Sequence, residues 1–329
     1  MNRALRLLRR RLVSSIPVLL IVIVGAFFLL ELAPGDAADA YLLSIGGGDP
    51  ALVQALRQSY GLEGSAGARL WLYLTSLARL DLGWSVIFNR PISDLILERL
   101  PNTLWLMGSA VALSFTVGSL LGIVAGSKPG SWGDRLLSTG SLALYAVPSF
   151  WLGLVLIVLF SVQLRWFPTS GIETIASGKE GLARARDIAW HLALPVAALG
   201  FIYLALFLRM MRTGMAEAWR QDYALAARAR GLGHRRIAVF HIARNALLPL
   251  VTMLGLQAAS MLGGSVVIES VFAIPGFGRL AHEAVAGRDA PLLTGIILVS
   301  AVLVILVNLA VDMAYALLDP RVGANEVAA

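Results

Sequence analysis

Long stretches of apolar residues alternate along the chain with shorter segments that carry most of its polar and charged residues. A helix that crosses about 30 Å of hydrocarbon needs about 20 consecutive apolar residues, at 1.5 Å per residue. By this criterion the pattern predicts an all-α membrane protein with six transmembrane helices. We place these spans at 13–33, 103–127, 134–161, 189–213, 247–272 and 291–318.

Composition agrees with this interpretation. Of the 329 residues, 58% are hydrophobic and 14% are charged, against about 25% charged in an ordinary soluble domain. The mean hydropathy is +0.77, which excludes a single water-soluble core. Cysteine is absent and there are 4 histidines, so we predict no disulfide, no metal site and no cofactor in this chain.

The first apolar stretch has two interpretations. Arg9, Arg10 and Arg11 form a basic start, and residues 38–40 resemble the cleavage site of a signal peptide. The apolar run of 13–32 is longer than the 7–15 residues of a signal-peptide core. This length favours a retained transmembrane helix.

Charge predicts the orientation of the spans, because basic residues concentrate in cytoplasmic segments. Arginines cluster before the first span and between the fourth and fifth spans. We therefore predict that both termini, 1–12 and 319–329, are cytoplasmic. The net charge of +7 is then explained by membrane orientation, and we predict a lipid bilayer and no nucleic acid as its partner.

The first outer segment, 34–102, is too long for a simple turn and predicts a small periplasmic cap. It holds turn signals and two short helical patterns, at 51–60 and 70–80. A second outer segment, 162–188, predicts an ordered loop.

The cytoplasmic segment 214–246 carries the most informative pattern, in residues 221–236. Ala224 to Ala229 favour a short helix, and Gly231 is placed to end it in a left-handed conformation. Small side chains allow another protein to approach the helix closely. An interfacial helix on lipid headgroups fits the composition equally well, so the residues alone leave both functions open.

This segment resembles the EAA loop of ABC importer permeases, with 225–227 at the Glu-Ala-Ala positions and Gly231 at the position of the glycine in that pattern. Two departures are evident, because Leu225 replaces the acidic residue and Arg244 stands in place of the final proline. Both departures are similar to the loop of dipeptide, oligopeptide and nickel permeases.

Short motifs in the same order along nearly the whole chain strengthen the resemblance to that family. They lie at 10–20, 34–36, 91–94, 99–104, 148–153, 269–272, 275–279 and 307–321.

The resemblance implies a type I ABC importer permease fold in the bacterial inner membrane, with spans two to six in a core at 103–318. It also implies several partners: a second, related permease in a heterodimer, two ABC ATPases that bind Mg-ATP, and an extracytoplasmic solute-binding protein. The coupling loop at 214–246 would contact the ATPase. The residues of this loop that match or flank the family pattern are Asp222, Tyr223, Ala226, Ala227, Arg228, Arg230, Gly231, Leu232, Gly233, Arg235 and Arg236.

The chain is not predicted to be an enzyme. The phosphate-binding pattern Gly-x-x-x-x-Gly-Lys-Ser/Thr does not occur in it, so ATP hydrolysis belongs to separate subunits. The pair His282 and Glu283 lacks the second histidine of a zinc protease. A secondary transporter is the less favoured alternative, because it needs no cytoplasmic docking segment and we find no inverted repeat.

Ionisable or polar residues within the spans are candidates for a function, because each is costly in lipid. Glu269, Asn308 and Asp312 are the candidates here, with Glu31 near the outer end of the first span. We favour structural roles for these residues, such as pairing with a neighbouring helix.

The substrate is the least constrained property. Peptide and nickel permeases share the motifs above, and the stretch 35–44 is similar to the nickel or metal-chelate branch. We predict di- or oligopeptides as cargo, with nickel or a metal chelate as the alternative.

Overall fold

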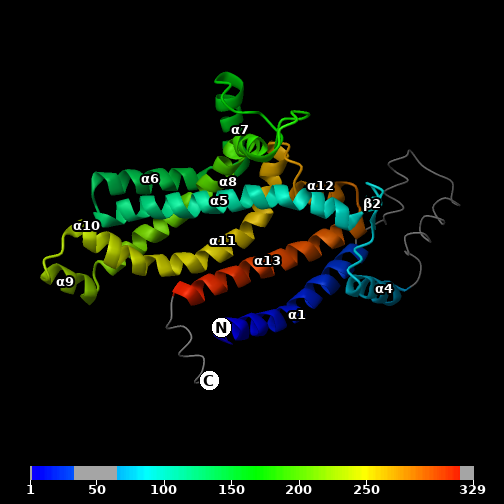
Figure 1. Cartoon of the computed structure of the whole chain (residues 1–329), viewed down its shortest axis with the longest axis horizontal. Coiled ribbons are helices and arrows are strands. Elements are labelled where there is room, and N and C mark those ends of the chain that lie inside the picture. Colours follow the sequence, from blue (N-terminus) through cyan, green and yellow to red (C-terminus); the bar gives the residue numbers. More distant parts are fainter. Residues whose placement is uncertain (1, 33–64, 319–329) are drawn as a thin grey trace. The chain divides into compact units, whose positions relative to one another are not determined.

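Helices make up nearly all of the part of the chain that the structure describes, a computed structural model covering residues 2–32 and 65–318 (Figure 1). The chain divides into two units, Met1–Thr103 with Pro275–Leu306, and Leu104–Ile274 with Val307–Ala329. We describe each unit by itself.

The helices are α1 (Asn2–Glu31), α4 (Ala66–Ala78), α5 (Ile92–Ser127), α6 (Trp132–Ala146), α7 (Ser149–Leu156), α8 (Gly181–Ala218), α9 (Asp222–Ala229), α10 (His234–Arg236), α11 (Arg244–Val271), α12 (Phe277–Ala286) and α13 (Ala290–Leu318). Two π-helical segments, η1 (Ile157–Gln163) and η2 (Ile237–Ala243), continue α7 and precede α11. A short antiparallel hairpin pairs β1 (Trp84–Ser85) with β2 (Arg90–Pro91).

The predicted all-α fold with six spans is confirmed in its main features. Within the described residues, 5 helices are long and apolar enough to cross a membrane, and a bent pair raises the number to 6. The long helices are not all limited to the bilayer. At 38 residues, α8 is about 57 Å long, nearly twice the thickness of the hydrocarbon.

The third predicted span needs a correction, because residues 134–161 do not form one straight helix. It consists of α6 and then α7 with η1, bent by 100°. The break falls at Val147 and Pro148, and Val147 is extended with ψ of 128°. The ring of a proline disfavours helical geometry in the residue before it, which explains the position of the break.

Several helices extend beyond the predicted spans. Helix α5 begins at Ile92 instead of 103 and contains Pro101, so part of the predicted cap is helical. Residues 92–96 pack in the core of the first unit, and this packing outweighs the hydrogen bond lost at Pro101. The ends of the predicted loop 214–246 are helical as well, in α8, α10, η2 and α11.

The predicted cap is described only from residue 65. Its helical pattern at 70–80 is α4, and the pattern at 51–60 lies outside the described residues. In the first unit, Arg69 of α4 forms an ion pair with Glu31 at the end of α1. Phe27 stacks on Tyr73 with ring centroids 6.4 Å apart, and burial raises the pKa of Tyr73 to about 12.

The hairpin of the first unit is held by Asp289, which is 1% exposed. Its carboxylate accepts hydrogen bonds from Ser85 Oγ (2.5 Å), the Ile87 backbone N–H (3.1 Å) and the Leu292 backbone N–H (3.1 Å). A buried carboxylate needs such partners to offset its loss of hydration. Asp289 therefore joins the hairpin to the start of α13.

Two of the sequence motifs meet in the same unit. Asn102 Nδ2 donates to the Pro275 carbonyl at 2.7 Å, and the Phe277 backbone N–H donates to Thr103 Oγ1 at 2.7 Å. The string 99–104 thus connects α5 to the turn that begins α12. The nearby core contains Ile92, Leu95, Phe277, Leu280 and Leu292.

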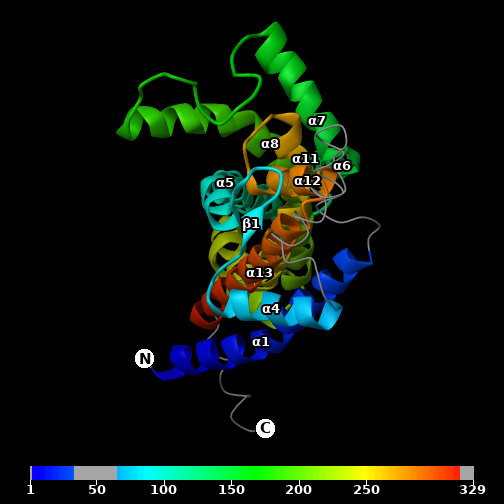
Figure 2. The same ribbon diagram turned by 90° about the vertical axis from the view of Figure 1, so that its right-hand side faces the viewer.

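In the second unit, α8 packs against α6 and α11 (Figures 1 and 2), and α5 meets α8 along a seam of glycines. A Cβ atom added to Gly118, Gly122 or Gly126 would lie within 3 Å of α8 atoms. Small residues at this spacing let two helices approach closely in a membrane. Ser114 Oγ donates to the Gly200 carbonyl at 2.8 Å and extends the contact.

The loop before α8 is ordered by polar contacts, although the end of the predicted segment 162–188 is helical, because α8 begins at Gly181. Asp187 accepts from the Thr174 backbone N–H at 2.6 Å and from Lys179 Nζ at 2.6 Å. Arg184 donates two hydrogen bonds to Glu173, and this partner lowers the pKa of Glu173.

Candidate functional site

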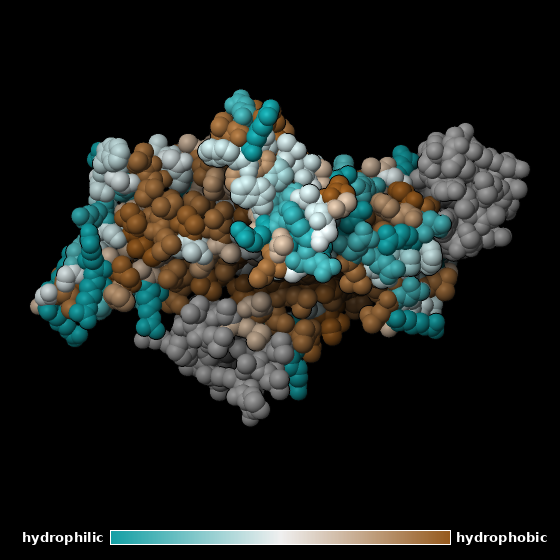
Figure 3. All heavy atoms as spheres, turned by 45° about the horizontal axis from the view of Figure 1, so that its top comes forward, coloured by the Kyte–Doolittle hydropathy of each residue, from teal (hydrophilic) through white to brown (hydrophobic). Residues whose placement is uncertain are grey.

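The predicted coupling segment lies at one end of the second unit, where α9 follows α8 after a short turn (Figure 1). Hydrophilic side chains gather at the end where α9 and α10 lie, and hydrophobic ones cover the neighbouring helices (Figure 3). Asp222 occupies the first turn of α9 and Arg228 the last turn. This order of charges complements the helix dipole.

The end of α9 is a Schellman motif. Gly231 has a φ of +72°, a conformation in which glycine avoids the Cβ penalty of other residues. Its N–H donates to the Arg228 carbonyl at 2.9 Å, and the Leu232 N–H donates to the Ala227 carbonyl at 3.3 Å. These are the two hydrogen bonds that define the motif, so the predicted stop at Gly231 is confirmed.

One face of α9 is buried against its own protein. Ala224 is 0% exposed and Ala227 is 4% exposed, and both pack in a cluster with Ile237, Ile242 and Met215. The idea that all the alanines of this helix leave room for another protein is therefore wrong. Ala224 and Ala227 allow close packing on η2. Of the four alanines of α9, only Ala226 and Ala229 are exposed.

The opposite face is exposed and chemically mixed. It carries an acid, two large side chains with apolar surface, and two arginines. These residues are Asp222, Tyr223, Leu225, Arg228 and Arg230. Leu225 is 65% exposed, although it stands where the family pattern has an acidic residue.

Trp219 and His234, which sequence reasoning did not select, hold the segment in place. The two rings stack with centroids 4.6 Å apart and an angle of 10°, and the Arg228 guanidinium lies 4.8 Å from the Trp219 centroid. Trp219 Nε1 donates to the Gly126 carbonyl at 3.0 Å, and His234 Nε2 lies 2.7 Å from the Ser127 carbonyl. Both rings therefore tie the segment to the end of α5.

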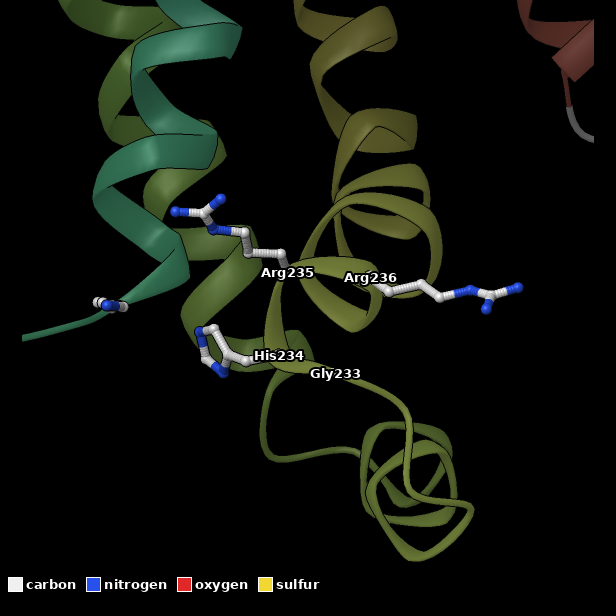
Figure 4. Close-up of a pocket in the computed structure, with 5 residues that line it drawn as sticks. Gly233, His234, Arg235 and Arg236 are labelled. Atoms are coloured by element: carbon white, nitrogen blue, oxygen red, sulfur yellow. The ribbon is translucent and has the colours of Figure 1, made fainter.

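The remaining predicted residues continue the chain from α9 into α10. Leu232 is half-buried and packs on the cluster described above, whereas Gly233, Arg235 and Arg236 are exposed. The last three residues line a pocket together with Lys128 and His234 (Figure 4). The structure thus brings all the coupling-loop candidates into one region of the second unit.

The three intramembrane candidates are not part of this region. Glu269 is buried (0% exposed) in α11, and Asn308 and Asp312 lie on α13, exposed and half-buried respectively. Among the described residues, no three His, Cys, Asp or Glu side chains form a group able to hold a metal ion.

The arrangement of apolar spans and a projecting polar loop is that of a multi-pass membrane protein. Comparisons with known proteins identify the family. Residues 118–324 match the sequence profile of the family described as "Binding-protein-dependent transport system inner membrane component", and the chain belongs to this family.

Similar proteins span almost the same length. The chain is 37% identical over 316 residues to a putative peptide transport system permease protein of Brucella abortus, covering 96% of this chain and 98% of the relative. It is 36% identical over 318 residues to the oligopeptide transport system permease protein AppB of Bacillus subtilis, covering 95% and 98%.

A solved structure shows the same fold at low sequence identity. A chain of the MetNI methionine ABC transporter, in an inward facing conformation, aligns with a TM-score of 0.55 and 18% identity. The alignment covers 68% of this chain and 96% of that chain.

The protein is therefore the permease component of a binding-protein-dependent ABC importer in the inner membrane. It is a membrane component and not the ATPase, and it works in a complex with ATPase and binding-protein partners. The predicted family and its fold are confirmed.

Proposed function

We propose that α9 is the helix through which the ATPase partner moves the membrane-spanning helices. A single observation carries the proposal: three sets of contacts hold α9 in place, and one of its faces is nevertheless exposed. Its packing on η2, its Schellman end and the Trp219 contact fix its position relative to α5, α8 and α11. A load applied to α9 would therefore be transmitted to these helices.

The composition of the exposed face of α9 favours contact with a protein rather than with a lipid surface. A helix that lies in the interface turns a continuous apolar face toward the acyl chains. In α9 the buried alanines face inward, and Leu225 and Tyr223 are flanked by Asp222 and Arg228 on the exposed side. Such a mixed face resembles a protein contact, in which a small apolar centre is surrounded by polar groups.

Substitution of Gly231 tests this role. Gly231→Asp puts a charged side chain on the exposed end of α9 and is expected to disturb the contact between α9 and the ATPase. ATP hydrolysis should then continue without substrate uptake. Both rates are measured in membrane vesicles at equal protein level.

A control variant separates this effect from added bulk and charge. Gly133→Asp introduces the same side chain in the first turn of α6, where there is open space and no positive φ. It should leave uptake and hydrolysis coupled. Normal uptake by Gly231→Asp would reject the proposed role of α9.

We propose that the complex holds a second, related permease as the partner of this chain, two ATPases on the cytoplasmic side and a binding protein outside. Family membership supports this composition. The expected readout is the subunit ratio of the purified complex in native mass spectrometry. A complex that contains two copies of this chain and no second permease would show that the permease pair is a homodimer and would overturn the proposed heterodimer.

We also propose that both termini and α9 are cytoplasmic and that the segment 34–102 is periplasmic. The arginine clusters support this orientation. Because the chain has no cysteine, single cysteines report it directly. Ser177→Cys in the outer loop should react with an impermeant maleimide in intact spheroplasts, and Ala226→Cys only after permeabilisation. The reverse pattern would invert the orientation.

For the cargo, we propose di- or oligopeptides. The relatives above are named as peptide and oligopeptide permeases. Uptake of labelled dipeptide and labelled nickel should be compared in cells with and without the gene. Loss of dipeptide uptake alone is expected, whereas loss of nickel uptake alone would establish the metal-import alternative.

A further inference from the structure

A basic pocket lies beside the coupling segment, between the end of α5 and the start of α10. It has a volume of about 640 Å³ and is lined by Lys128, Gly233, His234, Arg235 and Arg236. In Figure 4, Arg235 and His234 extend toward the end of α5, whereas Arg236 points the other way. His234 and Arg235 therefore face the end of α5, and together with Lys128, the residue that follows α5, we call them the inner wall of the pocket.

No acidic side chain neutralises this wall. Within residues 2–32 and 65–318, no carboxylate forms an ion pair with Lys128, Arg235 or Arg236. The buried carboxylate of Asp134, in the first turn of α6, is already engaged by Arg212 and by the Gly130 N–H. The cations of the pocket thus keep their capacity for an anion.

The wall is also held in a fixed shape. The Ser127 carbonyl can only accept, so His234 Nε2 carries the hydrogen of the 2.7 Å contact. Trp219 stacks on the same imidazole and donates to Gly126. Gly126 and Ser127 at the end of α5 are therefore bonded to Trp219 and His234, which reduces the ordering needed on binding.

The surroundings indicate the depth of the pocket in the membrane. It lies where two candidate spans end, α5 at Ser127 and the helix that runs from His234 to Met261. Three large apolar side chains that stand close in the sequence to Lys128 or Arg236 are exposed: Val124 at 63%, Trp132 at 76% and Phe240 at 70%. Cations beside exposed apolar groups, with a tryptophan, are typical of the headgroup level of a bilayer.

We propose that this pocket binds a phosphate group, and that in the membrane the phosphate is the headgroup of an anionic phospholipid. Arg235 and Lys128 bind the phosphate oxygens, because a guanidinium and an ammonium are the preferred cationic donors for that group. The acyl chains lie against Val124 and Phe240. Basic pockets between membrane helices bind anionic headgroups in this manner.

The site goes beyond the proposed role of α9 and does not depend on it. It places a lipid at the joint between α5 and the coupling segment.

Native mass spectrometry of the complete importer tests the proposal. Phosphatidylglycerol and phosphatidylcholine with the same acyl chains are titrated against the wild type and against Lys128→Gln/Arg235→Gln. We expect the wild type to prefer phosphatidylglycerol and the double variant to bind it roughly 30-fold more weakly, with about fivefold per charge. Arg236→Gln should have a smaller effect than either inner charge.

The matched control is Arg135→Gln/Arg220→Gln, which removes two exposed arginines of the same unit that do not line the pocket. It should leave the affinity unchanged. Equal losses in the two double variants, or no loss in either, would overturn the site. If the first double variant fails to assemble, Lys128→Gln alone, in an exposed turn, should still weaken binding about fivefold.

Two further arms identify the source of the phosphate. Inorganic phosphate should compete weakly with phosphatidylglycerol. If it binds with the same dependence on Lys128 and Arg235 and displaces the lipid, the phosphate site stands and the lipid assignment is overturned. If the double variant loses its ATPase subunits and keeps its lipid, the pocket is a protein-docking surface and the proposal is rejected.

Discussion

Glycines serve opposite purposes in two regions of the second unit, the α5–α8 seam and the end of α9. At Gly122 a Cβ atom would lie 2.5 Å from Met211 Cβ and 2.7 Å from the Leu208 carbonyl oxygen. At Gly231 no atom lies within 4 Å of the added Cβ, and only the φ of +72° demands glycine. The seam requires space, whereas the end of α9 requires a conformation.

This difference separates stability from function. A side chain at the seam must push two membrane helices apart, so its effect falls on the fold. A side chain at the end of α9 points into open space, so it costs the fold only the modest strain of a left-handed residue, and its main effect falls on whatever approaches that surface. Variants in the two regions should therefore fail in different assays.

The largest effect is expected for Gly122→Leu. Overpacking in a core costs about 1–3 kcal/mol, and here the obstacle is the backbone of α8, which cannot rotate away. We expect a larger loss of stability than this range and little folded protein. Thermal unfolding of a fluorescent fusion on size exclusion measures it.

Gly140→Leu in α6, where nothing lies within 4 Å of an added Cβ, is the matched control and should fold. Wild-type stability of Gly122→Leu would show that α5 and α8 do not meet at this seam.

The second effect concerns the conformation at Gly231. An L-residue in the left-handed region costs roughly 1–2 kcal/mol. Asparagine tolerates that region better than a β-branched residue. Gly231→Val should therefore lose more stability than Gly231→Asn, in the same thermal assay. Equal stability of both variants would mean that the backbone there is not left-handed.

These two regions also mark what the sequence alone can predict. The positive φ at Gly231 follows from a local pattern, a run of helix formers followed by glycine. The apolar spans are local as well, and so is the break at Pro148. The seam, the Trp219–His234 stack and the early start of α5 at Ile92 depend on contacts between distant segments, which no local pattern contains.

The same limit explains the errors on α9. The sequence predicts that the alanines of α9 leave room for another protein, because nothing in it shows which face of a short helix is covered. The partner for that face, η2, begins after Gly233, and the chain must turn back to reach it.

The third effect concerns the anchor of α9. Trp219→Phe keeps an aromatic ring beside His234 and removes the hydrogen bond from Nε1 to the Gly126 carbonyl. A net loss of about 1 kcal/mol is expected for one such bond. Hydrogen exchange of residues 222–232, measured by mass spectrometry, should increase. Unchanged exchange would mean that Trp219 does not hold the segment.

The smallest effect on stability is expected for Leu225→Ser. Leu225 is 65% exposed, and exposed substitutions usually change stability by at most about 0.5 kcal/mol. Its apolar side chain is nevertheless the centre of the face that we assign to the ATPase. The variant should fold like the wild type, since its neighbours Ala224 and Ala227 carry the internal packing. Association with the ATPase, measured by co-purification, should weaken. Together with Gly122→Leu this variant completes the contrast, because one loses the fold and the other loses the partner. Full ATPase association by Leu225→Ser would shift the docking face to Tyr223 and Arg228, whereas a loss of folding would show that Leu225 packs internally.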